Sequence, residues 1–262
     1  MSAENHKASA AQQSAVLRFR GTDGEHAVTI PVPPVQATPL DLLPAAREIS
    51  GTTTALALDR ERAAGRAISC RAGCGACCRQ LVGISVVEAE SLAQLVAAMP
   101  AERAEKIRAR FAAALKRLEE AGLLSPHEPP GNRALMVSDA NHADVARRNI
   151  SRRYFSLKIA CPFLEDESCS IHPERPMVCR EYHVTTPAAD CAELYQKEIG
   201  YVDPPVRMGE VLARTFAKVT AGETFMIPLI LSLEWSAMHS AEITAPRGGR
   251  VLMDAMVSEL GR

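Results

Sequence analysis

The chain has 262 residues, a hydrophobic content of 47% and a formal net charge of −1. A chain of this size can bury a core without disulfide staples, and its balanced charge gives no general attraction to nucleic acid or anionic lipid. The most apolar stretch, residues 225–233, is too short to span a bilayer and is expected to lie in the core. We therefore expect neither a nucleic-acid nor a membrane partner.

The N-terminal part of the sequence predicts a tail followed by a β-hairpin. Residues 1–14 are rich in Ala, Ser and Gln, and we expect them to be flexible. Residues 16–20 and 27–32 have strand character and flank the turn-forming residues 22–25. The N-terminus has no apolar run followed by a small-residue cleavage site, so we expect a cytoplasmic location.

Helical patterns dominate from residue 39 onward. The first predicted helix runs from residue 39 to a stop at Gly65. Ser85 and Glu88 have the spacing of a capping box and begin a second helix, which Pro100 separates from a third. The apolar stripe of the third helix recurs every three or four residues and comprises Ile107, Phe111, Leu115 and Leu118.

The later predicted helices are separated by loops. A connection rich in Pro and Gly over residues 122–138 leads to an amphipathic helix over about residues 139–158. The remaining predicted helices are a short one that begins at Pro176 and carries Cys179, one over residues 191–200 capped by Asp190 and Glu193, and several within residues 206–262.

These elements predict a mostly α protein with a small N-terminal β-hairpin and with cysteine loops organised by metal. We expect a helical C-terminal extension to pack on the same core as the rest of the chain. The predicted regions are a flexible tail (1–14), a hairpin with helices (15–65), a cysteine-cluster metal-binding domain (66–200) and the C-terminal extension (201–262).

Cysteine is the most informative residue type in this chain. Thiols at such density bind soft metal ions, form disulfides or carry out redox chemistry. A cytosolic chain keeps its thiols reduced, which favours metal ligation over disulfides. The eight cysteines fall into two groups, the first comprising Cys70, Cys74, Cys77 and Cys78 and the second Cys161, Cys169, Cys179 and Cys191.

The spacing within the first group bears on the kind of metal. Sites with four cysteines hold either Zn²⁺ or an iron–sulfur cluster. Cys77 and Cys78 are adjacent and cannot both approach one small tetrahedral ion without strain. We expect them to point toward two sites, or toward one larger cluster and a position beside it. Gly73 and Gly75 allow nearby backbone amides to donate hydrogen bonds to sulfur.

Cys70, Cys74 and Cys77 also have the spacing with which radical SAM enzymes hold a 4Fe–4S cluster. Such enzymes usually have an aromatic residue before the last of the three cysteines, where this chain has Ala76. The sequence that follows is helical rather than an alternation of strands and helices. The pattern therefore disfavours this class of enzyme.

Basic residues flank both groups of cysteines. Four thiolates around Zn²⁺ or a 4Fe–4S core leave a net charge of about −2, which must be offset where the site is partly buried. No acidic residue lies between Arg62 and Val87. The cations expected to compensate this charge are Arg66, Arg71 and Arg79 near the first group and Arg175 and Arg180 near the second.

Two histidines and an acidic run accompany the second group. We expect His172 and His183 to donate hydrogen bonds near the cysteines or to lie in the core, rather than to ligate metal. Residues 165–167, with the sequence Glu-Asp-Glu, are expected to form a solvated loop tip and not a site for a hard cation.

Both cysteine groups resemble the YkgJ-like cysteine-cluster family, whose members are zinc- or iron-chelating domains with a CxxCxxCC run and a later CPFL…CxIxxxRPxxCR segment. The one departure is three residues between Cys70 and Cys74, where the family pattern has two. The matching segments are CRAGCGACC (70–78), CPFL (161–164), CSIH (169–172), RPMVCREY (175–182) and Cys191.

This resemblance implies binding of zinc, or of iron as an iron–sulfur cluster, through all eight cysteines. It also implies that Arg175, Pro176 and Arg180 surround the bound metal. Some relatives are flagellin lysine N-methylases, but this sequence has no glycine-rich methyl-donor site to support that activity.

Three hypotheses follow. The leading one is a cytoplasmic protein that binds iron as an iron–sulfur cluster, most simply 4Fe–4S, for electron transfer, sensing or protein modification. The second is a structural Zn²⁺ protein that acts as a scaffold for a protein partner. The third is a cluster-dependent enzyme such as a protein lysine N-methylase, although no nucleophile–base pair stands out to define catalytic residues.

Overall fold

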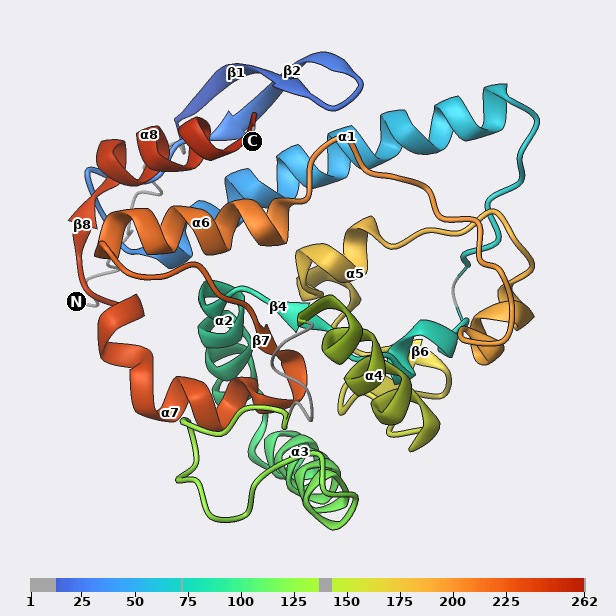
Figure 1. Ribbon diagram of the computed structural model, residues 1–262. Helices are drawn as coiled ribbons and strands as arrows, with labels where there is room; N and C mark the ends of the chain where they lie inside the picture. Colours follow the sequence, from blue (N-terminus) through green and yellow to red (C-terminus); the bar gives the residue numbers. More distant parts are fainter. Residues whose placement is uncertain (1–12, 72, 137–142, 262) are drawn as a thin grey trace, which may run out of the picture.

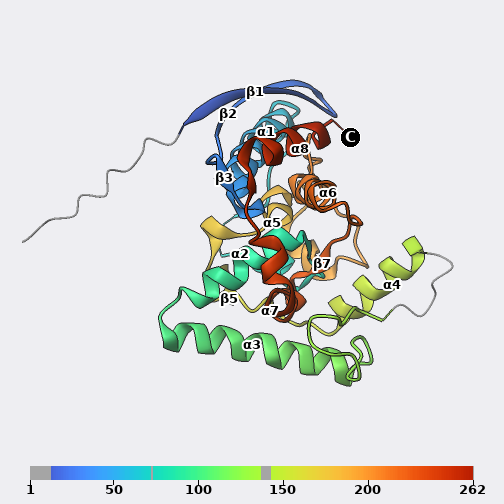
Figure 2. The same ribbon diagram turned by 90° about the vertical axis from the view of Figure 1, so that its left-hand side faces the viewer.

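The computed structural model describes residues 13–71, 73–136 and 143–261. The fold is mostly helical with a small N-terminal hairpin, as the sequence predicts. Figure 2 shows the hairpin lying over α1 (Leu43–Ala63) and α8 (Gly249–Glu259), with α3 (Ala101–Glu120) at the opposite side of the molecule. No helix in the described ranges is long and apolar enough to cross a membrane.

The hairpin consists of β1 (Ser14–Gly21) and β2 (Gly24–Pro31), which pair in antiparallel register. Alternation along β2 buries Val28 and Ile30, and this strand contacts α1. The predicted strands and turn are therefore confirmed. Residues 1–12 of the predicted tail lie outside the described residues, and Ser14 already belongs to β1.

Helix α1 connects the core to the cysteine loops. It follows the short 3₁₀ helix η1 (Pro39–Leu42) and ends at Ala63, as predicted. Gly65 has a φ of 77°, a left-handed conformation that favours glycine just after a helix. Figure 1 shows α1 crossing the molecule, so that its C-terminal end delivers the chain to the first cysteine group.

Two helices follow the first cysteine group. Helix α2 (Val86–Ala97) begins at the predicted capping box, in which Glu88 N donates to Ser85 Oγ and Ser85 N donates to the Glu88 carboxylate. Helix α3 turns its apolar stripe toward the core, with Ile107, Phe111 and Leu118 buried and Leu115 partly buried against them.

The C-terminal helices complete the core. Helix α8 packs on α6 (Met208–Thr220), and α7 (Ser232–Ile243) packs on α2. One apolar cluster contains side chains from β2 through α8, while the division into four regions remains a prediction. Two short pairings join distant segments, β3 (Gln36–Ala37) with β8 (Arg247–Gly248) and β4 (Gly83–Ile84) with β7 (Ile227–Pro228).

The second cysteine group lies among short elements. Helix α4 (Ala143–Ser156) corresponds to the predicted helix over 139–158, of which residues 139–142 lie outside the described residues. The short elements near the cysteines are η2 (Ala76–Arg79), β5 (Leu164–Glu165), β6 (Ser168–Cys169), η3 (His172–Glu174), α5 (Met177–Glu181) and η4 (Ala188–Glu193).

The predicted helix over residues 191–200 is wrong. The 3₁₀ helix η4 ends at Glu193, and the chain then turns back so that Val184 forms a β-bridge with Tyr201. A continuous helix would place Cys191 and Ile199 about 12 Å apart along its axis. Both residues instead pack in one small apolar cluster with Val184, which a helix in this segment would disrupt.

The prediction that residues 225–233 lie in the core is correct only in part. The 3₁₀ helix η5 (Leu229–Leu231) is buried, but Phe225 is 45% exposed and Met226 is 37% exposed. The segment enters the core only at Ile227, where β7 pairs with β4. An apolar run alone does not reveal at which residue the chain reaches that pairing.

Candidate metal centre

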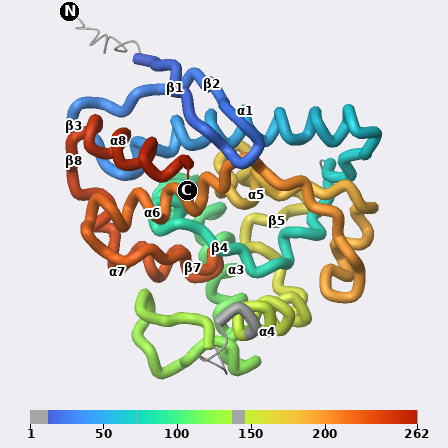
Figure 3. The backbone as a smooth tube through the Cα atoms, turned by 45° about the horizontal axis from the view of Figure 1, so that its top comes forward, coloured from blue at the N-terminus to red at the C-terminus, as the bar shows by residue number. Residues whose placement is uncertain are grey.

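All eight cysteines lie in loops or short elements and have free thiols. In Figure 1 and Figure 3 the chain after α1 and the chain around η4 lie side by side, beyond the C-terminal end of α1. Cys191 is buried and the other seven cysteines are half-buried. Their positions are the loop after α1 (Cys70, Cys74), η2 (Cys77, Cys78), the loop after α4 (Cys161), β6 (Cys169), α5 (Cys179) and η4 (Cys191).

Backbone hydrogen bonds join these loops directly. Cys161 N donates to the carbonyl oxygen of Cys78 at 2.7 Å, which links the two cysteine groups although these residues are 83 positions apart in sequence. Ser69 N donates to the carbonyl oxygen of Val184 at 3.0 Å. The two cysteine groups are therefore neighbours in the fold.

Three cysteines of the second group form what we call the inner thiols: Cys161, Cys169 and Cys179. Burial is the largest cause that raises the pKa of each, to about 12 for Cys161 and well above the ordinary value for Cys179. The charges of Cys161, Cys77 and Cys169 raise the pKa of Cys179 further. Thiols with such mutual repulsion become stable thiolates only beside a compensating cation.

Cys70, Cys74 and Cys191 form a second set, the outer thiols. Burial raises the pKa of Cys191 to about 11, and the charges of Cys70, Cys77 and Cys74 add to this effect. The pKa of Cys70 is likewise raised by burial, with smaller contributions from Cys77 and Cys74. Cys70 and Cys191 also contact the same small apolar cluster, whereas Cys161 and Cys169 pack against the main core.

Cys77 and Cys78 are adjacent residues of η2 and belong to neither set. A hydrogen bond between their thiols is the largest cause that raises the pKa of Cys77, followed by burial. The charge of Cys77 influences both the inner and the outer thiols. Within the described residues, no three His, Cys, Asp or Glu side chains are gathered closely enough to hold one metal ion.

Arg175 is the cation whose charge affects several of the thiols. Its charge lowers the pKa of Cys70, Cys77 and Cys169. Arg175 Nε and His183 Nδ1 are buried and have no hydrogen-bond partner among the described residues. His183 is fixed through its other ring nitrogen, Nε2, which lies 3.0 Å from the carbonyl oxygen of Arg180. Because a carbonyl oxygen only accepts, Nε2 carries the ring hydrogen, and burial lowers the pKa of His183, so its Nδ1 is an acceptor. Arg175 Nε is therefore the buried donor that remains available to an anionic group near the thiols.

Arg79 interacts both with an acidic side chain and with a thiol: Glu167 is the largest cause that raises the pKa of Arg79, and the charge of Cys78 adds to this effect. Arg79 Nη1 donates to the Gly75 carbonyl oxygen at 2.8 Å, and the guanidinium forms a two-pronged ion pair with Glu167, with hydrogen bonds of 2.9 and 2.6 Å. A Cβ atom at Gly75 would lie 2.5 Å from Glu167 Oε2. The β5–β6 turn thus packs closely against the first cysteine loop. A side chain at position 75 would push the turn away from this loop.

The other predicted neighbours are distributed as follows. The tip of the β5–β6 turn, with Asp166 and Glu167, is exposed as predicted. Arg66 forms an ion pair with Glu61, so its charge is already balanced. Arg180 donates from Nε to the Arg175 carbonyl oxygen, and Arg71 and His172 are exposed.

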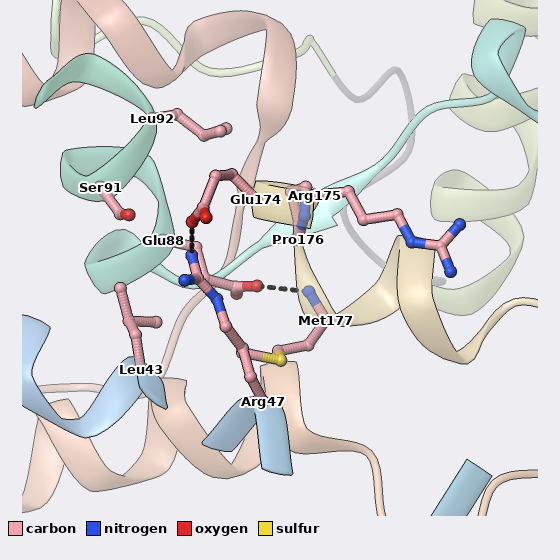
Figure 4. Close-up of a pocket in the computed structure, with 9 residues that line it drawn as sticks. All are labelled: Leu43, Arg47, Glu88, Ser91, Leu92, Glu174, Arg175, Pro176 and Met177. Carbon is pink, nitrogen blue, oxygen red and sulfur yellow. Dashed lines mark hydrogen bonds and ion pairs between the residues drawn. The ribbon is translucent and has the colours of Figure 1, made fainter. Parts of the chain in front are cut away.

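Two buried carboxylates hold α5, the helix that carries Cys179. Glu88 accepts a hydrogen bond from Met177 N at the start of this helix (Figure 4). Glu181 at its end accepts from Ser50 Oγ at 2.8 Å and from Met208 N at 3.0 Å, and burial raises the pKa of Glu181 to about 7. Figure 4 also shows Arg47 paired with Glu174 beside this site.

Sequence reasoning did not identify either carboxylate as a partner of α5. The capping-box spacing predicted only the local role of Glu88, and nothing in the sequence indicated Glu181. An acidic residue flanked by apolar ones, as Glu88 is by Val87 and Ala89, is the one available signal of a buried carboxylate with a distant partner.

The donor set fits a thiophilic metal: eight thiols lie in loops that hydrogen bonds hold together, and Arg175 presents an unused Nε–H donor beside them. A mostly helical fold with such loops defines a cysteine-cluster metal-binding protein. Residues 69–203, more than half of the chain, match a family described as CxxCxxCC, a putative zinc- or iron-chelating domain, and the chain belongs to this family. No curated protein and no solved structure matches the chain.

Proposed function

We propose that the cysteines bind iron as a 4Fe–4S cluster and that the remaining thiols bind a second metal ion. The inner thiols, completed by one of Cys77 and Cys78, would hold the cluster. The outer thiols and the other member of this adjacent pair would hold the second ion. The observation that carries the proposal is how the cysteines pack: Cys161 and Cys169 contact the main core, whereas Cys70 and Cys191 belong to a separate small apolar cluster. The backbone hydrogen bond from Cys161 N to the Cys78 carbonyl oxygen joins the two parts.

The sequence spacing of the cysteines supports iron over zinc. Tetrahedral Zn²⁺ with Zn–S bonds of about 2.3 Å draws its sulfur ligands to about 3.8 Å from one another. A four-iron cluster keeps its cysteines farther apart, because each thiolate binds a different iron atom. Cys77 and Cys78 are adjacent and cannot both approach one small ion without strain, which agrees better with the larger group.

The surroundings of the thiols support the same proposal. Arg175 offsets thiolate charge at Cys70, Cys77 and Cys169, and its unused Nε can donate to a cysteine or inorganic sulfur. Hydrogen bonds to sulfur and partial solvent exposure both tune cluster potentials. The half-buried inner thiols would place a cluster near the surface, where it can exchange electrons with a protein partner. We therefore propose electron transfer or redox sensing as the role.

Anaerobic purification followed by iron, zinc and sulfide analysis tests this proposal. We expect iron and sulfide in equal amounts and a broad visible absorption that dithionite bleaches reversibly. Cys179→Ser should abolish iron and sulfide, whereas Cys191→Ser should remove the second metal and retain the absorption. Ser168→Ala, a change at an exposed position beside Cys169, is the matched control. Zinc without iron or sulfide would overturn the proposal and leave a structural scaffold.

A further inference from the structure

A groove of about 890 Å³ lies outside the cysteine loops. It is bounded by α4, the segment from Phe225 to Leu231, α7 and the loop over residues 131–135. Leu81, three residues after Cys78, also lines it, so the groove adjoins the chain that leaves the metal centre. Its volume is in the range of pockets that enclose small organic molecules, about 300–1,000 Å³.

One wall of the groove is aromatic. The rings of Trp235 and His239 are stacked with centroids 4.3 Å apart, and the ring of Phe225 meets Trp235 at 6.2 Å and 60°. Phe225 and the neighbouring Met226 are both substantially exposed. Exposed apolar side chains gathered in a concave site indicate binding rather than chance exposure.

Among the described residues, the charges that line the groove are of one sign. Arg133 is neutralised by ion pairs with Glu119 and Glu234. Arg147 is exposed and has no ion-pair partner among the described residues. In the part of the chain that the structure describes, no aspartate or glutamate lines the groove. An unpaired guanidinium beside an aromatic wall complements an anion with a flat apolar body.

We propose that this groove binds a small organic anion with an aromatic body. The aromatic part would lie against Phe225 and Trp235, and a carboxylate or sulfonate group would face Arg147. The inference depends on the shape and charge of the groove and not on which metal the cysteines hold. A helix or peptide from another protein is a different occupant, which a groove that binds neither small probe would favour.

The test uses two fluorescent probes that differ mainly in charge. Anilinonaphthalene sulfonate is an aromatic anion, and N-phenylnaphthylamine is its uncharged counterpart. Trp235 is the single tryptophan of the chain and lies in the groove, so its emission reports occupancy independently of the probe signal. Titrations of the metal-loaded protein should show saturable binding of both probes with quenching of Trp235 emission.

Adjacent arginines provide a matched pair of variants. Arg147→Glu places an anion at the groove and should weaken sulfonate binding about fivefold, since an exposed ion pair contributes up to about 1 kcal/mol. The uncharged probe should change less than twofold. Arg148→Glu makes the same change at an exposed residue that does not line the groove and should affect neither probe. Phe225→Ala should weaken both probes.

Three results would overturn the proposal. They are the absence of saturable binding to the wild-type protein, equal effects of Arg147→Glu and Arg148→Glu on the sulfonate, and binding that is unchanged in Phe225→Ala. The melting temperature and metal content of each variant are measured in parallel. If Phe225→Ala fails to fold, the comparison of the two arginine variants with the two probes still decides the question.

Discussion

Glu88 and Met177 are 89 positions apart in sequence, yet the carboxylate of Glu88 accepts the backbone N–H of Met177 at 2.7 Å. The same carboxylate accepts Ser85 N and Ser85 Oγ through its other oxygen. One buried side chain therefore satisfies the starts of two helices, α2 and α5. Helix α5 carries Cys179. The contact therefore fixes the position of this cysteine by anchoring its helix to α2, and not by an interaction within the cysteine loops.

Substitutions at Glu88 should therefore destabilise the fold. Glu88→Ala leaves several buried donors without an acceptor and should cost about 3 kcal/mol in the free energy of unfolding. Glu88→Gln keeps the shape of the side chain, but its NH₂ group would face one of the two backbone N–H groups, so that two donors meet. This variant should cost about half as much free energy of unfolding. Glu102→Ala, at an exposed residue of α3, should change stability by less than about 0.5 kcal/mol. Denaturant unfolding of all three variants measures the difference, and equal midpoints would refute the assignment.

Several elements of the fold were predictable from the sequence because their signals are local. Local signals placed the hairpin, α1 with its stop at Gly65, and α2 with its capping box, because each depends on residues within one turn or one strand pair. The cysteine spacing likewise indicated a metal-binding domain. The contact of Glu88 with Met177 was not predictable, since it depends on how distant segments pack.

The incorrect helix over residues 191–200 has the same origin. Its capping pattern is a local preference, but the β-bridge of Val184 with Tyr201 and the packing of Cys191 with Ile199 are stronger constraints. Tertiary contacts override helix propensity where the chain must return to a fixed point. The grouping of thiols into inner and outer sets depends on the same non-local arrangement.

Two glycines should respond oppositely to the same substitution. Gly51 lies in α1, is exposed, and has no neighbouring atom within 4 Å of the position that a Cβ would occupy, so Gly51→Ala should stabilise the protein by about 0.5–1 kcal/mol. At Gly249 a Cβ would overlap the Pro34 carbonyl oxygen, while Gly249 N donates to the Val35 carbonyl oxygen at 2.9 Å. Gly249→Ala should cost at least about 2 kcal/mol. Thermal melting with the same metal content checks both values, and shifts of the same sign would contradict this account.

Arg133 fixes the loop between α3 and α4 onto α7. Its side chain is 9% exposed and pairs with Glu119 and, through two hydrogen bonds, with Glu234. Arg133→Met leaves both carboxylates unpaired and should cost about 3 kcal/mol, whereas Arg133→Lys retains charge but loses the planar two-pronged contact. Arg62→Ala removes an exposed pair with Asp59 and should be nearly neutral.

A double-mutant cycle separates the ion pair from packing. Adding Glu234→Gln to Arg133→Met removes one of the stranded charges and should recover part of the lost free energy of unfolding. A strictly additive cycle would show that Arg133 stabilises the loop through apolar contact alone.

Metal removal should unfold the cysteine loops before the core. The main apolar cluster extends from β2 to α8 and includes few residues from the segments around Cys70 and Cys191. The buried part of the cluster beside these segments consists only of Val184, Cys191 and Ile199 among the described residues, which is too small to order the surrounding loops. Bound metal is therefore expected to supply most of the stability of this region.

Hydrogen exchange measured by mass spectrometry, before and after chelation under reducing conditions, tests this expectation. Protection should be lost over residues 66–82 and 184–203 and retained in α6 and α8, whose buried residues belong to the main cluster. Cys191→Ser in the metal-loaded protein should reproduce the loss over 184–203, because it removes an outer thiol. Uniform loss of protection throughout the chain would mean that the metal organises the whole core, and unchanged exchange would mean that the loops are ordered by packing alone.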